Sequence, residues 1–178
     1  MPSLNKVSAA LFAAALAASA GVAASGQEHL PRISRADALK VLNDCVHRGK
    51  CEGAAEDVAE TLIRRYWAGD TALLRPLFDA RLRSDAALSQ TLGDFFATLL
   101  EKHPRRFLVG LAGRPAVEQR KLCAAAGTAD GSGMPDEWMR ERKRSLRRYA
   151  AGRGRLASAA RICIAGLDEA AERARLNR

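Results

Sequence analysis

The chain has 178 residues, of which 48% are hydrophobic and 28% are charged. This composition excludes an intrinsically disordered chain and a collagen-like fibre, and the length is typical of a single domain. Alanine accounts for 36 residues and aromatic side chains for only 5%, which favours helices over β-sheet. The formal net charge of +9 bears on partners and solubility rather than on fold.

Residues 1–24 have the pattern of a cleaved secretory signal peptide. Lys6 precedes an apolar run over residues 7–18, and small residues follow, so that cleavage is expected after Ala20 or Ala24. The run is too short and too rich in alanine for a typical membrane span, although a retained anchor helix is the alternative. No Arg-Arg pair precedes it, which indicates the general secretory route. We therefore expect a periplasmic or extracellular protein with no membrane span in its mature part.

All four cysteines lie beyond the expected signal peptide, and an even number in an exported chain predicts two disulfides. Three pairings are possible, of which we favour Cys45–Cys51 and Cys123–Cys163. In the chain-entropy model the two cross-links stabilise the fold by about 2.4 and about 4 kcal/mol, respectively. A metal site built from Cys45, His47 and Cys51 is the alternative, but this spacing is not a standard zinc pattern. We therefore predict neither a metal nor a cofactor.

Residues 25–33 read as a polar leader, and residues 34–178 as one helical domain. Ser34 and Asp37 form a variant of the capping box at the start of the first helix, and Gly49 ends that helix. Pro76 should kink or split the third helix. The helix that begins at Ser84-Asp85 should be the longest and the centre of the core. The helices expected in this half cover residues 34–49, 53–68, 71–80 and 84–103.

Proline and glycine punctuate the second half of the domain. Pro104 and Pro115 should each occupy the first position of a helix, where the missing N–H costs nothing. The turn-rich stretch 127–135 divides the chain. The helices expected here cover residues 104–113, 116–126 and 136–151, with a last helix after Gly152-Arg-Gly154.

We thus expect an all-α fold of seven or eight short amphipathic helices in one compact bundle or in stacked helical hairpins. The segments Gly69-Asp70-Thr-Ala-Leu73 and Ser84-Asp85-Ala-Ala-Leu88 open successive helices fifteen residues apart. This echo resembles helical-hairpin repeats of the HEAT or armadillo kind. Good helix-start chemistry alone would produce the same echo, so both arrangements stay open.

The positive charge gathers near the C-terminus. Residues 25–137 hold 16 basic and 16 acidic side chains, whereas residues 138–178 hold 12 basic and 4 acidic ones, a net charge of +8. On a helix, four of these cations share one surface sector, with Lys143 at its edge, opposite an apolar stripe that includes Met139 and Leu146. We call these five the basic ridge: Arg140, Lys143, Arg144, Arg147 and Arg148.

A basic ridge on an exported protein would attract an anionic polymer of the envelope or an acidic protein, with nucleic acid the last candidate. The alternative is a solvated helix face without a ligand, since arginine and alanine are abundant throughout the chain. A helix lying on a membrane is a further alternative, which Glu141 weakens.

Catalytic motifs are hard to find in this sequence. Glu101 and Asp94 come closest to a carboxylate pair for glycoside chemistry. Their seven-residue spacing puts them on one helix face about 10.5 Å apart along the axis, slightly beyond the inverting range. The sequence therefore predicts an exported binding or interaction module of the cell envelope rather than an enzyme. The alternatives are an enzyme that acts on a wall polymer through Glu101 and Asp94, and a scaffold or inhibitor that holds a protein partner.

Overall fold

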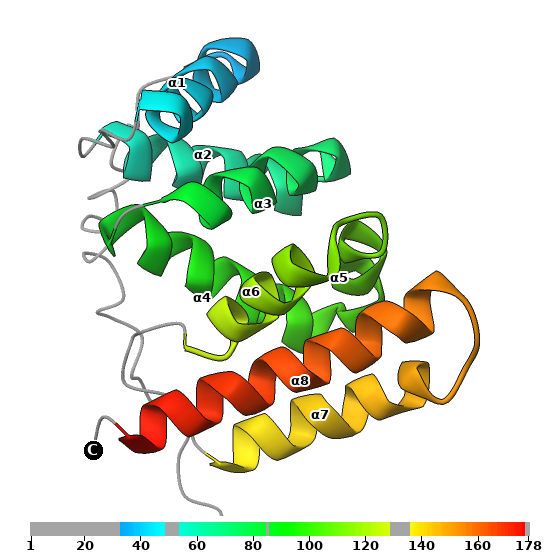
Figure 1. Ribbon diagram of the computed structural model, residues 1–178. Coiled ribbons are helices and arrows are strands. Elements are labelled where there is room, and N and C mark those ends of the chain that lie inside the picture. The colour runs from blue at the N-terminus through cyan, green and yellow to red at the C-terminus, as the bar shows by residue number, and fades with distance from the viewer. Residues whose placement is uncertain (1–32, 49–53, 85, 129–135, 177–178) are drawn as a thin grey trace, which may run out of the picture. The chain divides into compact units, whose positions relative to one another are not determined.

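The computed structural model of the protein describes residues 33–48, 54–84, 86–128 and 136–176. Within these ranges the chain forms eight α-helices and one 3-10 turn, η1, with no β-strand, which confirms the all-α prediction (Figure 1). The expected signal peptide, and the leader apart from Ile33, lie outside the described residues. The elements are α1 (Arg35–Arg48), α2 (Ala54–Trp67), η1 (Thr71–Leu73), α3 (Leu74–Arg83), α4 (Ala86–Lys102), α5 (Pro104–Leu111), α6 (Ala116–Ala126), α7 (Asp136–Ala150) and α8 (Arg155–Leu176).

The predicted cap of the first helix is confirmed. The Ser34 hydroxyl accepts a hydrogen bond from the backbone N–H of Asp37 at 3.1 Å and donates one to the Asp37 carboxylate at 2.6 Å. The Arg35 side chain then binds Asp70, the residue before η1, at 2.6 Å. The start of α1 is therefore fixed both locally and to a segment far along the chain.

The prolines follow the prediction at two of three positions. Pro104 is the first residue of α5, as predicted. Pro115 instead precedes α6 as its N-cap, with φ −55° and ψ 144°, and its carbonyl accepts the N–H of Gln119. The segment around Pro76 is divided, as predicted, into η1 and α3, and the division falls just before the first turn of α3, in which Pro76 lies. An N–H in this turn has no acceptor within the helix, so the proline costs α3 no hydrogen bond.

The core is built around α4, which contacts α2, α3, α5 and α6. The side chains of Phe78, Phe96 and Phe107 are fully buried at the meeting of α3, α4 and α5, with ring centroids 4.7 Å apart for Phe78–Phe96 and 5.5 Å for Phe78–Phe107. The prediction that this helix is the longest is wrong, because α8 has 22 residues and α4 has 17. The apolar stripe of α8 continues for more turns, and it is covered by two helices, α6 and α7.

Helix contacts link neighbours along the chain and helices further apart. Helices α2, α4, α6 and α8 contact one another in series, and α1 pairs with α2, α3 with α4 and α7 with α8. Further contacts join α1 to α3, α3 to α6, and α5 to α4 and α8. The pair α7–α8 runs antiparallel, as Figure 1 shows. Helices α6 and α8 approach closely because Gly166 has no side chain: a Cβ there would lie 2.5 Å from the carbonyl oxygen of Arg120. The backbones of α6 and α8 therefore meet at van der Waals distance.

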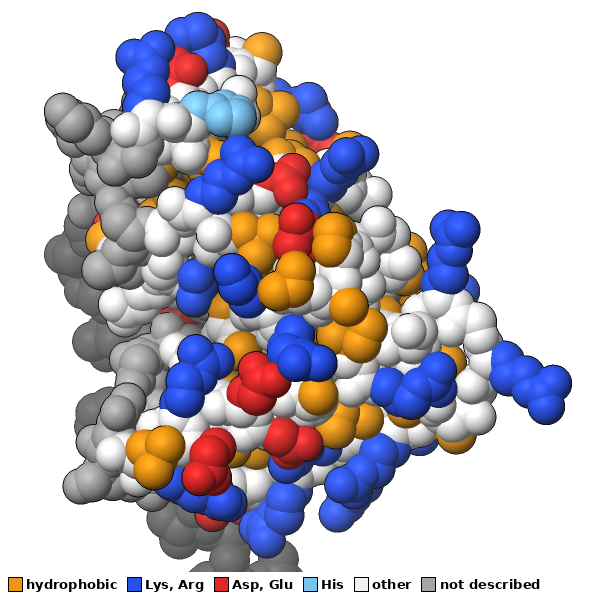
Figure 2. All heavy atoms as spheres, in the orientation of Figure 1, with side chains coloured by type: hydrophobic (Ala, Val, Ile, Leu, Met, Phe, Trp, Pro, Cys, Tyr) orange, Lys and Arg blue, Asp and Glu red, His pale blue; other side chains and the backbone are white. Residues whose placement is uncertain are grey.

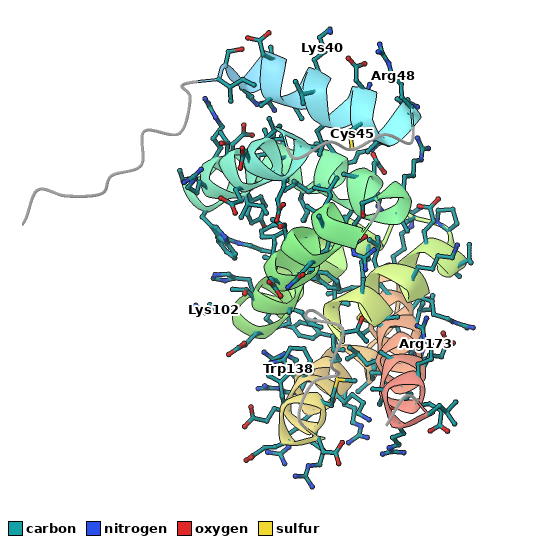
Figure 3. The ribbon with its side chains drawn as sticks, turned by 90° about the vertical axis from the view of Figure 1, so that its left-hand side faces the viewer. Lys40, Cys45, Arg48, Lys102, Trp138 and Arg173 are labelled. Atoms are coloured by element: carbon teal, nitrogen blue, oxygen red, sulfur yellow. A yellow bond between two sulfur atoms is a disulfide. The ribbon has the colours of Figure 1, made fainter. Side chains whose placement is uncertain are left out.

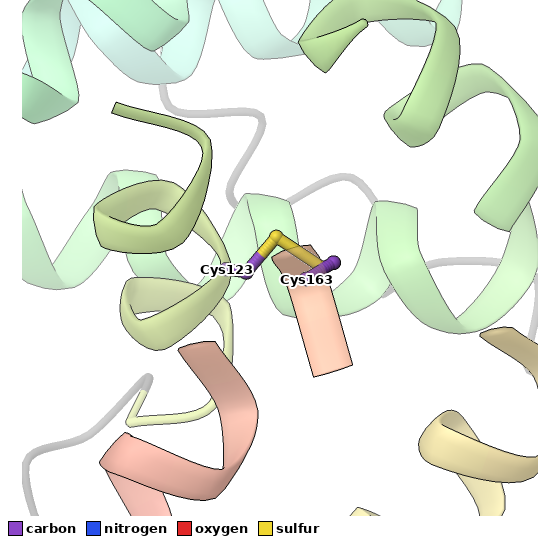
Figure 4. Close-up of a disulfide and its surroundings, with 2 residues drawn as sticks. All are labelled: Cys123 and Cys163. Carbon is purple, nitrogen blue, oxygen red and sulfur yellow. A yellow bond between two sulfur atoms is a disulfide. The ribbon is translucent and has the colours of Figure 1, made fainter. Parts of the chain in front are cut away.

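A disulfide joins Cys123 of α6 to Cys163 of α8, as predicted (Figure 4). Both residues are fully buried, and their Cα atoms are 5.1 Å apart, within the ordinary range for disulfides. Cys45 is buried in α1 and is not a free thiol. Its predicted partner, Cys51, lies outside the described residues, so the second disulfide remains a prediction.

Candidate functional site

The basic ridge lies on α7, whose charges suit the helix dipole: Asp136 and Glu137 occupy the first turn, and Arg147 and Arg148 the last. Met139 and Leu146 are buried on the opposite side, which fixes the rotation of the helix. Cations are visible at the lower edge of Figure 2, over α7 and its connection to α8.

Four of the five ridge residues are exposed and have no acidic partner among the described residues: Arg140, Arg144, Arg147 and Arg148. The fifth, Lys143, differs. Its side chain is 21% exposed, and its ammonium group lies 2.8 Å from the Asp168 carboxylate of α8. The ridge therefore presents four charges that are not neutralised, while its fifth charge helps to join α7 to α8.

Arg142 is a structural residue that sequence analysis counted only as part of the basic stretch. It is 4% exposed, forms an ion pair with Glu101 of α4, and its guanidinium carbon lies 3.1 Å from the ring centroid of Trp138, which is labelled in Figure 3. Burial lowers the pKa of Arg142, while Glu101 acts in the opposite direction. The signal was present in the sequence: Met139, Arg142 and Leu146 recur at helical spacing, so the arginine lies on the apolar stripe.

Glu101 and Asp94, the carboxylates considered for catalysis, line neither of the two cavities described below. Glu101 is engaged by Arg142, which gives it a structural role. Asp94 is exposed on α4. Among the described residues, no group of three or more His, Cys, Asp or Glu side chains is arranged to hold a metal ion. The structure thus brings neither carboxylate into a cleft.

An open groove of about 1120 Å³, which the sequence did not predict, lies elsewhere on the described part of the chain, and we call it the α3–α5 groove. Helix α5 lies against α3 because Gly110 packs on Leu74 and Phe78, where an added Cβ would come within 2.8 Å of their side chains. Residues of η1, α3, α5, the α5–α6 connection and the start of α6 form its walls, together with Tyr66 of α2, the C-terminal end of α4 and Tyr149 of α7.

The α3–α5 groove is strongly basic. Arg114 donates to Asp79 at 2.7 Å and to Glu118 at 3.1 Å, so that both acidic side chains of the lining are engaged by one cation. Four further cations line the groove and have no acidic partner among the described residues: Arg75, Lys102, Arg105 and Arg106. Lys102 is labelled at the end of α4 in Figure 3. The groove is thus a concave site with an excess of positive charge.

A second, smaller cavity of about 290 Å³ is also lined by cations, namely Arg81, Lys121 and Arg173. Burial lowers the pKa of Arg81, whose Nε has no hydrogen-bond partner. Its Nη1 donates to the Ser89 hydroxyl at 3.3 Å. The Nε atom of Arg81 is buried under protein atoms, so it is not available to a ligand in the cavity.

No helix in the described ranges combines the length and the apolar character that crossing a bilayer requires. Comparison of the chain with known protein families, with curated proteins and with solved structures found no match. The basic ridge and the α3–α5 groove are therefore the features that bear on function.

Proposed function

We propose that this protein is an exported, non-enzymatic binding module of the cell envelope that attaches to an anionic polymer through the basic ridge of α7. The observation that carries the proposal is the separation of charges on that helix. Lys143 and Arg142 are neutralised by Asp168 and Glu101, whereas the four exposed arginines of the ridge have no acidic partner among the described residues. Unneutralised like charges on one face repel one another, and a polyanion relieves this repulsion.

The buried disulfide supports the export part of the proposal. Disulfides form and persist in oxidising compartments, and the pattern of residues 1–24 is that of a signal peptide for the general secretory route. We therefore assign the mature protein to the periplasm of a cell with two membranes or to the exterior of a cell with one.

The order of helix contacts favours stacked helical hairpins over a compact bundle. The series α2, α4, α6 and α8, with α1, α3 and α7 each paired to the helix that follows, is the arrangement in which hairpins stack upon one another. Such stacks present extended surfaces that suit polymeric ligands. The ion pair between Glu101 and Arg142 argues against the alternative of wall-polymer hydrolysis, because it engages one of the two carboxylates which that reaction would need.

Retention of the mature protein on heparin–agarose at increasing salt tests this function. Charge reversal of Arg144, Arg147 and Arg148 to Glu should lower the eluting salt concentration strongly, because three unneutralised charges become repulsive. A matched control reverses three exposed cations elsewhere, Arg64, Arg83 and Lys121, and changes the net charge by the same amount. The control should elute close to the wild type. Equal elution of the two variants would refute the ridge as the binding surface, since net charge alone would then govern retention.

A further inference from the structure

The α3–α5 groove is a second basic surface that differs from the ridge in shape. Its volume of about 1120 Å³ exceeds the range of about 300–1,000 Å³ that is usual for small-molecule pockets, and it is open to solvent. An open groove of this size suits a segment of a chain better than an enclosed small molecule.

The charge of the α3–α5 groove calls for an anionic ligand. Arg75, Lys102, Arg105 and Arg106 are not paired with acids among the described residues, and the acids Asp79 and Glu118 are taken up by Arg114. Arg105 and Arg106 also occupy the first turn of α5, which contains no acidic residue. Cations there oppose the helix dipole and destabilise the free helix. A bound carboxylate would offset this repulsion.

The uncharged part of the α3–α5 groove indicates which anion fits. Val109 is 58% exposed in the lining, and Pro104, Pro115 and Tyr149 add further apolar surface. Tyr66, Thr71 and His103 in the lining could hydrogen-bond to a sugar or to a peptide alike, so it is the exposed apolar surface that favours a ligand with apolar side chains. Carboxylates that alternate with apolar side chains match both parts of the surface.

We propose that the α3–α5 groove binds an acidic peptide segment of a protein partner. Its Asp and Glu side chains pair with Arg75, Lys102, Arg105 and Arg106, and its apolar side chains lie on Val109 and Tyr149. This site is separate from the ridge and its polymer, so the protein would join an envelope polymer to an acidic protein. The groove is an inference of its own and stands if the ridge proposal fails.

Two exposed valines provide a matched pair of variants. Val109 lines the α3–α5 groove, whereas Val117, 61% exposed at the start of α6, does not. Binding is measured by fluorescence anisotropy of the mature protein with a fluorescein-labelled peptide of glutamates that carries a leucine at every third position. Val109→Glu places a negative charge in the groove without removing a cation or a buried side chain. It should weaken binding on the order of tenfold, while Val117→Glu should stay close to the wild type.

Removal of the cations gives a second test. Arg75→Gln/Arg105→Gln/Arg106→Gln should also weaken the peptide on the order of tenfold, because three ion pairs are lost together. The same peptide with Gln in place of Glu should not bind. Ridge reversal at Arg144, Arg147 and Arg148 should leave peptide binding intact, which separates the two proposals.

Several outcomes would overturn the proposal for the α3–α5 groove. These are no binding of the acidic peptide by the wild type, equal binding by the Val109 and Val117 variants, or loss of binding on ridge reversal. A polysaccharide would be the ligand of the groove instead if three results came together. The ridge-reversed protein would bind heparin, Val109→Glu would weaken that binding, and the acidic peptide would not bind.

Discussion

The disulfide between Cys123 and Cys163 should contribute more to stability than any other single feature of the described structure. It closes a loop with a sequence separation of 40 residues between α6 and α8. In the chain-entropy model, a loop of this length restricts the unfolded chain by about 4 kcal/mol. The free energy of unfolding of a domain is about 5–15 kcal/mol, so the cross-link supplies a large part of it.

Replacement of both cysteines by alanine removes the cross-link and little volume. We expect the free energy of unfolding to fall by about 4 kcal/mol and the Tm to fall by about 8–16 °C. The urea m-value should rise, because the unfolded chain without the cross-link exposes more surface. Urea unfolding followed by circular dichroism measures the free energy of unfolding and the m-value, and a thermal scan measures the Tm. A rise in m together with a fall in stability indicates that the disulfide acts mainly on the unfolded state.

The control keeps the packing and removes only the bond. In a Cys45→Ala/Cys51→Ala background, the protein is unfolded and reduced, refolded under reducing conditions and compared with its oxidised form. The reduced form should lose nearly the same free energy as the alanine variant. A loss below about 1 kcal/mol with an unchanged m-value would refute the reasoning, since the chain entropy of the loop would then not govern stability.

Three further predictions concern packing and charge in the core. Glu101→Gln leaves the buried Arg142 guanidinium without its carboxylate and should lower the free energy of unfolding, measured in urea, by about 1–2 kcal/mol. The loss is not larger because Glu101 is half-exposed, so water can solvate the guanidinium from that side. Gly166→Ala should lower it by about 1–3 kcal/mol, since the new Cβ meets a backbone oxygen at 2.5 Å. Gly113→Ala, where no atom lies within 4 Å, should not destabilise, and equal losses in the two glycine variants would contradict the close helix approach. Burial raises the pKa of Tyr66 above its usual value of 10.0, so the unfolded chain ionises first as the pH rises. The stability linked to that proton is complete below pH 10 and is lost above it, and Tyr66→Phe should remove this part of the alkaline loss in a pH series of urea unfolding.

The α3–α5 groove is basic although most of its lining comes from a part of the chain without net charge. Over residues 25–137 basic and acidic side chains balance. The fold separates those charges in space: Arg114 gathers Asp79 and Glu118, while Arg105 and Arg106 remain without acids beside the α3–α5 groove. A count along the chain cannot show this, because the partners of Arg114 include a residue 35 positions away.

The ridge was predicted more fully, because its residues lie on one helix. Helical spacing placed Arg140, Arg144, Arg147 and Arg148 on one sector, and all four are exposed. The same spacing could not tell that Lys143 pairs with Asp168, since that acid comes from α8. The sequence of α7 alone therefore predicts the ridge. The number of its charges that stay unneutralised depends on the packing of α7 against α8.

The amino-acid sequence alone determined the features that depend on interactions between residues a few positions apart. Helix content, the Ser34–Asp37 cap and the position of Pro104 depend on backbone hydrogen bonding and side-chain geometry over one or two turns. The pairing of Arg142 with Glu101, the pairing of Lys143 with Asp168 and the α3–α5 groove needed the packed structure. Each of these depends on which helices meet, and that choice balances burial, close approach and charge pairing over the whole domain rather than over any one segment.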